Sequence, residues 1–327
     1  MMYLQFYGLS DLPFEIAPNP GYLFLTRQHR EALSNLQYGL FSAKALTVLI
    51  GEAGTGKTTL LRAALESERC KNVRCVLMNN PTLTRDEFIT MLATRFDLGP
   101  EAAQSKTVLL SRLELLIKRR RSEGEITALV VDEAQSLSDE LLEEVRLLAN
   151  LETSSEKLLP LVLAGQPSLR DRLNDSRLLQ LKQRVALRCE IVPFGMPETA
   201  SYMSSRIKTA GGDPRRLFTR EAVELIHSYS GGIPRTINVV CDNALLAGMA
   251  VQRRPVDSDL VQEVCQDFDL SGAHASGVAT RTTEVEVAQS SQSAEDSAGA
   301  QTGAYTRRGS MFKNAAARGF ALLGSRR

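Results

Sequence analysis

The segment GEAGTGKT at residues 51–58 constrains the fold of this chain more than any other feature. It matches the pattern G-x-x-x-x-G-K-[ST], and it lies between an apolar run at residues 45–50 and a helix-like run at residues 59–65. Its three glycines let the backbone curl so that successive N–H groups point at phosphate oxygens, and the start of the following helix adds its dipole. The segment therefore predicts a phosphate-binding loop that joins a buried strand to a helix.

Four further apolar runs have the length and composition of buried strands. They lie at residues 73–78, 127–131, 159–164 and 185–192. Helix-like segments separate them, and this alternation is typical of a parallel sheet with helices on both faces. Between residues 197 and 269 the apolar residues recur only at helical spacing. We therefore expect an α/β nucleotide-binding domain at residues 1–196 and a smaller helical domain at residues 197–269.

The composition changes again after residue 269. Residues 270–309 are rich in Ser, Ala, Gly, Thr and Gln and poor in large apolar side chains, so we expect a disordered linker there. Residues 310–327 then combine apolar side chains at helical spacing with four basic residues and no acid. This pattern predicts a short basic amphipathic segment, suited to an anionic membrane surface or to a groove on a partner protein.

The overall composition is that of a soluble globular protein. Of the 327 residues, 43% are hydrophobic and 24% are charged, and the formal net charge of +1 gives no bulk attraction to nucleic acid or acidic membranes. Neither a signal peptide nor a run of about 20 apolar residues is evident, so a cytoplasmic location is expected. The five cysteines form no CxxC pair, which favours free thiols in a reducing compartment.

The phosphate-binding loop supplies the first candidate site residues. Lys57 would reach the outer phosphates of ATP, and the Thr58 hydroxyl would be a ligand of Mg²⁺. The expected nucleotide-binding residues are Gly51, Glu52, Ala53, Gly54, Thr55, Gly56, Lys57, Thr58 and Thr59.

Two acidic residues, Asp132 and Glu133, directly follow the apolar run at residues 127–131. Ligands bind at the edge of a parallel sheet where the strands end. Asp132 is therefore expected to hold Mg²⁺ through water, and Glu133 is expected to orient and polarise the attacking water molecule.

Further polar candidates follow two other strand-like runs and a helix start. Gln166 follows residues 159–164, where it could read the γ-phosphate or simply form a turn before a proline. Arg184 and Arg188 flank the start of the last strand, and either could reach a neighbouring subunit's ATP or form a surface salt bridge. Arg235 follows Pro234 in the first turn of a helix, from which it could lean over the phosphates or remain solvated.

These motifs together resemble the AAA+ ATPases similar to the general secretion pathway protein A, a family with pilus-biogenesis and exopolysaccharide-export relatives. The resemblance covers about residues 2–269. Its strings are Tyr3–Phe6–Tyr7–Gly8–Leu9, Pro13–Phe14, Pro18–Asn19–Pro20, His29, Ala32–Leu33, Tyr38–Gly39–Leu40, Asp132–Glu133–Ala134–Gln135, Asn150–Leu151–Glu152–Thr153, Gly165–Gln166–Pro167, Gln183–Arg184 and Gly232–Ile233–Pro234–Arg235–Thr236–Ile237–Asn238.

The resemblance implies roles as well as a fold. Gln166 would be the sensor-1 residue, Arg235 the sensor-2 residue, and Arg184 an arginine finger that acts on a neighbouring subunit. The sheet order would be 5-1-4-3-2 with a helical lid, and the segment around residues 22–29 would line the adenine pocket. The implied protein is an Mg²⁺-dependent ATPase that forms an ATP-dependent homo-oligomer, for which a hexamer is one candidate size.

Two functions of different classes fit these features. The first is a motor or switch ATPase that supports a cell-envelope machine for secretion, pilus assembly or polysaccharide export, with envelope proteins as partners. The second is a DNA-associated ATPase resembling the transposition helper ATPases, although the sequence offers no helix-turn-helix, no zinc motif and no basic stripe beyond residues 118–121.

Secretion members of the family continue into a transmembrane helix and a peptidoglycan-binding domain. No such segment is evident here, which favours a cytoplasmic relative, peripheral to the inner membrane, over direct cell-wall binding.

The basic segment leads to a prediction of its own. Deleting residues 306–327 should leave ATPase activity unchanged, because the predicted site residues lie far upstream, but should abolish membrane association or partner capture. ATPase assays, cell fractionation and pull-down with the full chain as control would test this. If all three readouts match the full chain, the segment is an inert tail.

Overall fold

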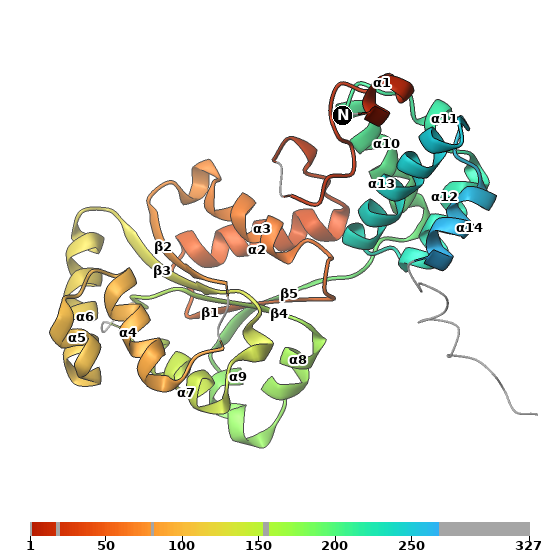
Figure 1. Ribbon diagram of the computed structural model, residues 1–327. Helices are drawn as coiled ribbons and strands as arrows, with labels where there is room; N and C mark the ends of the chain where they lie inside the picture. Colours follow the sequence, from red (N-terminus) through yellow and green to blue (C-terminus); the bar gives the residue numbers. More distant parts are fainter. Residues whose placement is uncertain (1, 18–19, 80–81, 153–156, 268–327) are drawn as a thin grey trace, which may run out of the picture. The chain divides into compact units, whose positions relative to one another are not determined.

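The computed structural model describes residues 2–17, 20–79, 82–152 and 157–267 (Figure 1). The linker predicted at residues 270–309 and the basic segment predicted at residues 310–327 lie outside the described residues.

A five-stranded parallel sheet forms the centre of the first part of the chain (Figure 1). The strands are β1 (Leu46–Gly51), β2 (Val73–Met78), β3 (Ile126–Val131), β4 (Leu161–Gly165) and β5 (Val185–Ile191). Their spatial order, β2-β3-β4-β1-β5, is the predicted order 5-1-4-3-2 read from the other edge. Strand β4 begins two residues later than the apolar run suggested, since Pro160 has no N–H to donate to a neighbouring strand.

Helices cover both faces of the sheet. On one face lie α2 (Arg27–Phe41) and α3 (Lys57–Leu65), whose leucines pack on inward side chains of the strands. The other face is covered by α4 (Arg85–Arg95), α6 (Lys106–Ser122), α7 (Asp139–Leu148), α8 (Pro167–Leu173) and α9 (Leu179–Lys182). A short helix, α5 (Pro100–Gln104), connects α4 to α6. The near-continuous burial of β1, β3 and β4 follows from this double cover.

The polar residues that end three strands meet at one edge of the sheet. In the parallel register Ile50 of β1 pairs with Gly165 of β4, and Val131 of β3 pairs with Leu163 of β4. The chain positions that follow β1, β3 and β4 are therefore neighbours in space, with the end of β4 in the middle. This arrangement brings together the phosphate-binding loop, the two acids and Gln166.

A second hydrophobic cluster is built from helices. It contains α10 (Met196–Thr209), α11 (Pro214–Leu217), α12 (Arg220–Ser230), α13 (Pro234–Ala250) and α14 (Ser258–Asp267). The predicted helical lid is thus present, and Pro234 occupies the first turn of α13 as expected.

The N-terminal segment packs into this helical cluster rather than against the sheet. Helix α1 (Met2–Tyr7) lies on α13, where the Tyr3 hydroxyl donates to Asp242 at 2.5 Å. Phe14 is fully buried in the same cluster. The hydrophobic contacts of the lid therefore include residues from both ends of the described chain, while the domain boundary at residue 196 remains a prediction.

The cysteines agree with the sequence-based expectation. All five are free, four are buried, and Cys75 is half-buried. Burial raises the pKa of the Cys189 thiol to about 11, so this thiol stays protonated and unreactive near neutral pH. Among the described residues, no helix combines the length and the apolar character that crossing a bilayer requires.

Gly232 packs closely against Phe194, which follows β5. It has a φ of +74°, and an added Cβ would lie 2.0 Å from the carbonyl oxygen of Phe194. The Phe194 N–H in turn donates to the Gly232 carbonyl at 2.8 Å. A side chain at this position would separate the two segments.

Gly232→Ala should therefore destabilise the protein by several kcal/mol, on the order of 3 or more, because it adds a backbone collision to an unfavourable φ. Gly124→Ala is the matched control: Gly124 has a φ of +81° with nothing within 4 Å of the added atom. It should lose only about 1 kcal/mol for the left-handed backbone. Urea unfolding midpoints would measure both, and equal losses would contradict the close packing at Gly232.

Candidate active site

The phosphate-binding loop joins β1 to α3 and has the conformation that its glycines permit. Gly54 and Gly56 have φ values of +82° and +100°, and Gly56 is the N-cap residue of α3. The Lys57 side chain is only 4% exposed and folds back over the loop, with its ammonium group donating to the carbonyls of Gly51 at 3.0 Å and Glu52 at 3.1 Å. The loop thus encloses a cation at the start of a helix, which is a site for an anion.

Burial lowers the pKa of Lys57 below its usual value, and the negative charges of Glu133, Asp132 and Glu52 act against that shift. A buried ammonium group that is bound only by carbonyl oxygens lacks a full counter-charge at close range. A phosphate group in the loop would supply that charge.

Asp132 is buried at the end of β3 and contacts the loop directly. The Thr58 hydroxyl donates to one carboxylate oxygen of Asp132 at 2.5 Å, and the N–H of Glu133 donates to the other at 2.9 Å. In the described part of the chain, no group of three or more His, Cys, Asp or Glu side chains could hold a metal ion by itself. The pair fits an Mg²⁺ ion, which keeps several waters and takes few protein ligands together with substrate phosphates.

Glu133 is held in an unusual backbone conformation, with a φ of +54°. Its carboxylate accepts a hydrogen bond from the Gln135 side chain at 2.6 Å and one from the Gln166 side chain at 3.4 Å. Gln135 also accepts from the backbone N–H of Gln166 at 3.0 Å. The structure thus joins the two predicted residues, Glu133 and Gln166, both directly and through Gln135, to which the motif analysis gave no role. The only sequence signal for Gln135 was its place in the string that follows the acids.

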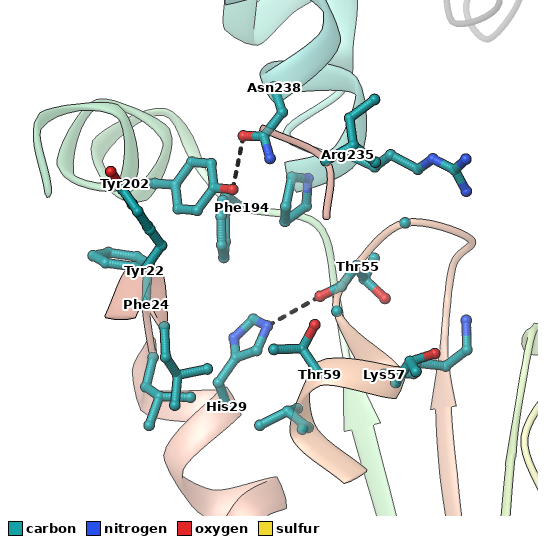
Figure 2. A pocket seen from close by; sticks show the side chains of 18 of the residues that line it. Tyr22, Phe24, His29, Thr55, Lys57, Thr59, Phe194, Tyr202, Arg235 and Asn238 are labelled. Carbon is teal, nitrogen blue, oxygen red and sulfur yellow. Dashed lines mark hydrogen bonds between the residues drawn. The ribbon is translucent and has the colours of Figure 1, made fainter. Parts of the chain in front are cut away.

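The lid contacts the phosphate-binding loop at the start of α13. The backbone N–H of Arg235 donates to the Gly54 carbonyl at 3.2 Å, and an added Cβ on Gly54 would lie 2.9 Å from the Cβ of Arg235. Figure 2 shows the guanidinium of Arg235 extending above the loop from this point. The side chain is exposed and lines the pocket together with Glu133 and Lys57.

A cavity of about 370 Å³ extends from the phosphate-binding loop toward Phe24 and Tyr202 (Figure 2). Its far end is lined by Tyr22, Leu23, Phe24, Leu25, Phe194, Tyr202, Arg206 and Asn238. The predicted segment around residues 22–29 therefore borders the cavity, and aromatic and aliphatic side chains there suit a flat apolar base. The contributions of Phe194, Tyr202, Arg206 and Asn238 were not predicted.

His29 connects the cavity wall to the loop. Its ring lies between the Thr26 hydroxyl at 2.7 Å and the Thr55 carbonyl at 3.3 Å (Figure 2). Burial lowers the pKa of His29, although the hydrogen bond to Thr55 opposes the shift. The ring is therefore neutral near pH 7, and the nitrogen that faces Thr55 carries the proton.

Arg184 lies at the other end of the sheet. It precedes β5, whose first residue, Val185, pairs with Leu46 at the start of β1. The phosphate-binding loop follows the end of β1, five residues further along, or about 16 Å for a strand. Arg184 therefore does not line the cavity of its own chain. Arg188 lies within β5 rather than at its start, and its exposed side chain borders a separate polar groove with Glu31 and Asn35.

Comparisons with known proteins agree with this geometry. Residues 41–173 match the AAA domain family. The chain is 39% identical over 249 residues to general secretion pathway protein A of Aeromonas hydrophila, covering 76% of this chain and 45% of that protein. It is 32% identical over 145 residues to the ATP-dependent target DNA activator B of Escherichia phage Mu, covering 44% and 42% of the two chains. The chain spans less than half the length of the curated relatives it matches.

Solved structures support the fold. Cdc6p from Pyrobaculum aerophilum superposes with a TM-score of 0.60 at 18% identity, over 78% of this chain and 70% of that one. The Drosophila ORC bound to DNA gives a TM-score of 0.60 at 18% identity, over 79% and 64%. The sheet order, the phosphate-binding loop and the lid define a P-loop protein of the AAA+ class. Within that class, the chain belongs to the AAA+ ATPases that resemble general secretion pathway protein A.

Proposed function

We propose that this protein hydrolyses ATP to ADP and phosphate in the cavity between the phosphate-binding loop and the lid. The observation that carries this proposal is the convergence of Lys57, Glu133 and Gln166 at one edge of the sheet. A loop that only bound phosphate would not need a carboxylate positioned by two amides beside it.

Different groups of the chain bind the phosphates, activate the water and hold the metal ion. The N–H groups of the loop and the ammonium group of Lys57 bind the phosphate oxygens and stabilise charge that develops on them. Glu133 accepts a proton from the attacking water, and the Gln166 amide orients that water against the γ-phosphate. Thr58 and Asp132 would hold Mg²⁺, which neutralises phosphate charge when it is bound. Arg235 of the lid lies over the loop, where it would contact the outer phosphates.

The cellular role that we propose is support of a cell-envelope machine for secretion, pilus assembly or polysaccharide export. The similarity to general secretion pathway protein A over 249 residues supports this role. Partners would then be envelope proteins and further copies of this chain, and the location would be the cytoplasm or the inner surface of the membrane.

A second candidate is a DNA-associated ATPase, which the 32% identity to the target DNA activator B of phage Mu favours. The basic run of the present chain, residues 118–121, lies near the end of α6, where its side chains are exposed or half-buried. Within this run Lys118 pairs with Glu114 at 2.6 Å and Arg120 donates to Thr127 at 3.5 Å. Salt-dependent DNA binding would favour this candidate, and capture of envelope proteins without DNA binding would favour the first.

Glu133→Gln should bind ATP with nearly unchanged affinity and hydrolyse it far more slowly, since the amide can still hydrogen-bond to water but cannot take its proton. Lys57→Ala is the contrasting variant, and it should lose nucleotide binding because the phosphates lose their buried cation. Equilibrium binding and single-turnover hydrolysis would separate the two effects. A fall in turnover of less than about tenfold in Glu133→Gln would exclude Glu133 as the base.

Arg184 should act on the ATP of a neighbouring copy, because it lies at the opposite end of β1 from its own loop. Turnover per chain should then rise with protein concentration. A mixture of Arg184→Ala and Lys57→Ala chains should be more active than either alone, since each supplies the group that the other lacks. Arg188→Ala, which removes an exposed arginine from β5 itself, should keep wild-type activity. Turnover that is independent of concentration in a strict monomer would refute the proposal.

A further inference from the structure

The far end of the cavity contains three polar side chains that form one hydrogen-bonded chain. Arg206 donates to the Tyr202 hydroxyl at 3.0 Å, and that hydroxyl donates to the amide oxygen of Asn238 at 2.8 Å. All three residues line the cavity and all three are buried, with exposed fractions of 8%, 5% and 6%. Buried polar groups that meet in this way are held in fixed orientations.

The direction of the chain is fixed by Arg206, because a guanidinium can only donate hydrogen bonds. The Tyr202 oxygen must therefore accept from Arg206, and its single proton is left for Asn238. Burial raises the pKa of the Tyr202 phenol, so the hydroxyl keeps the proton that this step requires. The amide of Asn238 must then present its oxygen to Tyr202 and its nitrogen to the other side.

Arg206 is itself held in place by the N-terminal segment. It donates to the backbone carbonyls of Pro13 and Glu15, the latter at 3.1 Å, and its guanidinium lies over the Tyr22 ring at 4.8 Å. Within the described part of the chain, no carboxylate forms an ion pair with it. Rotation of the Arg206 side chain would break its hydrogen bonds to two backbone carbonyls and to the Tyr202 hydroxyl. The start of the hydrogen-bonded chain is therefore rigid.

The amide nitrogen of Asn238 has no such partner. Figure 2 shows it turned away from Tyr202, and no described residue accepts a hydrogen bond from it. Asn238 lines the cavity, so a donor that has no protein partner there is open to an acceptor supplied by a ligand. Asn238 lies three residues after Arg235 on α13, and Figure 2 shows it on the side of the cavity that holds Tyr202 rather than Lys57.

We propose that Asn238 donates a hydrogen bond to an unprotonated ring nitrogen of the nucleotide base, and that Tyr202 and Arg206 position it to do so. This inference rests on the proposed function, because it assigns a specificity determinant within the same site. A fixed donor selects an acceptor on the base, so it cannot pair with the exocyclic amino group of adenine. A freely rotating amide could hydrogen-bond to either group, because it carries both a donor and an acceptor.

The test uses the full-length chain and three analogues of ATP in which N1, N3 or N7 of the ring is replaced by carbon. Equilibrium dissociation constants are measured by competition against a fluorescent ADP. One analogue should bind the wild-type chain about tenfold more weakly than ATP, and the other two should bind like ATP. Asn238→Ala should bind ATP about as weakly as the wild type binds that one analogue. The variant should bind ATP and the analogue with equal affinity.

Tyr202→Phe tests the positioning role, because it removes the hydroxyl and leaves both Asn238 and the packing in place. ATP affinity should fall less than in Asn238→Ala, and discrimination against the one analogue should shrink as the amide becomes free to rotate. Tyr229→Phe, at a half-buried tyrosine of α12 outside the cavity, should behave like the wild type. Thermal unfolding of each variant would show that it is folded.

The outcomes separate this inference from the proposed function. If ATP binds and is hydrolysed but all three analogues bind like ATP, or if the selective loss persists in Asn238→Ala, the role of Asn238 is wrong and the ATPase stands. If the wild-type chain binds no nucleotide, both proposals fall together.

Discussion

The contact between the start of α13 and the phosphate-binding loop is the constraint on which the site depends. The N–H of Arg235 donates to the Gly54 carbonyl, and this approach leaves no room for a Cβ on Gly54. The same glycine has a φ of +82°, which a residue with a side chain rarely adopts. One position thus satisfies two demands, the curl of the loop around phosphate and the seating of the lid. Without that seating the cavity would lose one of its walls.

The charges at the site are arranged around a buried lysine. Lys57 has Asp132, Glu133 and Glu52 as its nearest negative groups, but its ammonium group is bound only to backbone carbonyls. The hydrogen bond that Asp132 accepts from a side chain comes from Thr58 and not from Lys57. The phosphates of a nucleotide would therefore complete the pairing of Lys57, which explains why the loop keeps a cation buried at a helix start.

Sequence reasoning predicted those parts of the site that lie in short continuous strings. The phosphate-binding loop and the pair Asp132 and Glu133 follow from local patterns and from the rule that parallel strands end at one edge, while the sheet order came from the family resemblance. Two features could not be predicted in this way. The N-terminal helix reads as the start of the first domain but packs on α13, a contact across 239 residues of sequence between Tyr3 and Asp242. Tyr202 and Asn238 look like ordinary positions in amphipathic helices, and only the fold brings them to the cavity.

Helix α13 supplies both residues that we propose as contacts for the two ends of a nucleotide. Arg235 would contact the phosphates and Asn238 the base, and the two lie three residues, or about 4.5 Å of helix, apart. A helix is stiff over one turn, so both side chains must move together with the lid. The N-terminal segment is attached to the same lid, because Arg206 donates to its backbone and the Tyr22 ring stacks on Arg206. A ligand that fills both ends of the cavity therefore favours one lid position more strongly than a ligand that fills either end alone. The binding energy of the base can in this way help to position Arg235 over the phosphates.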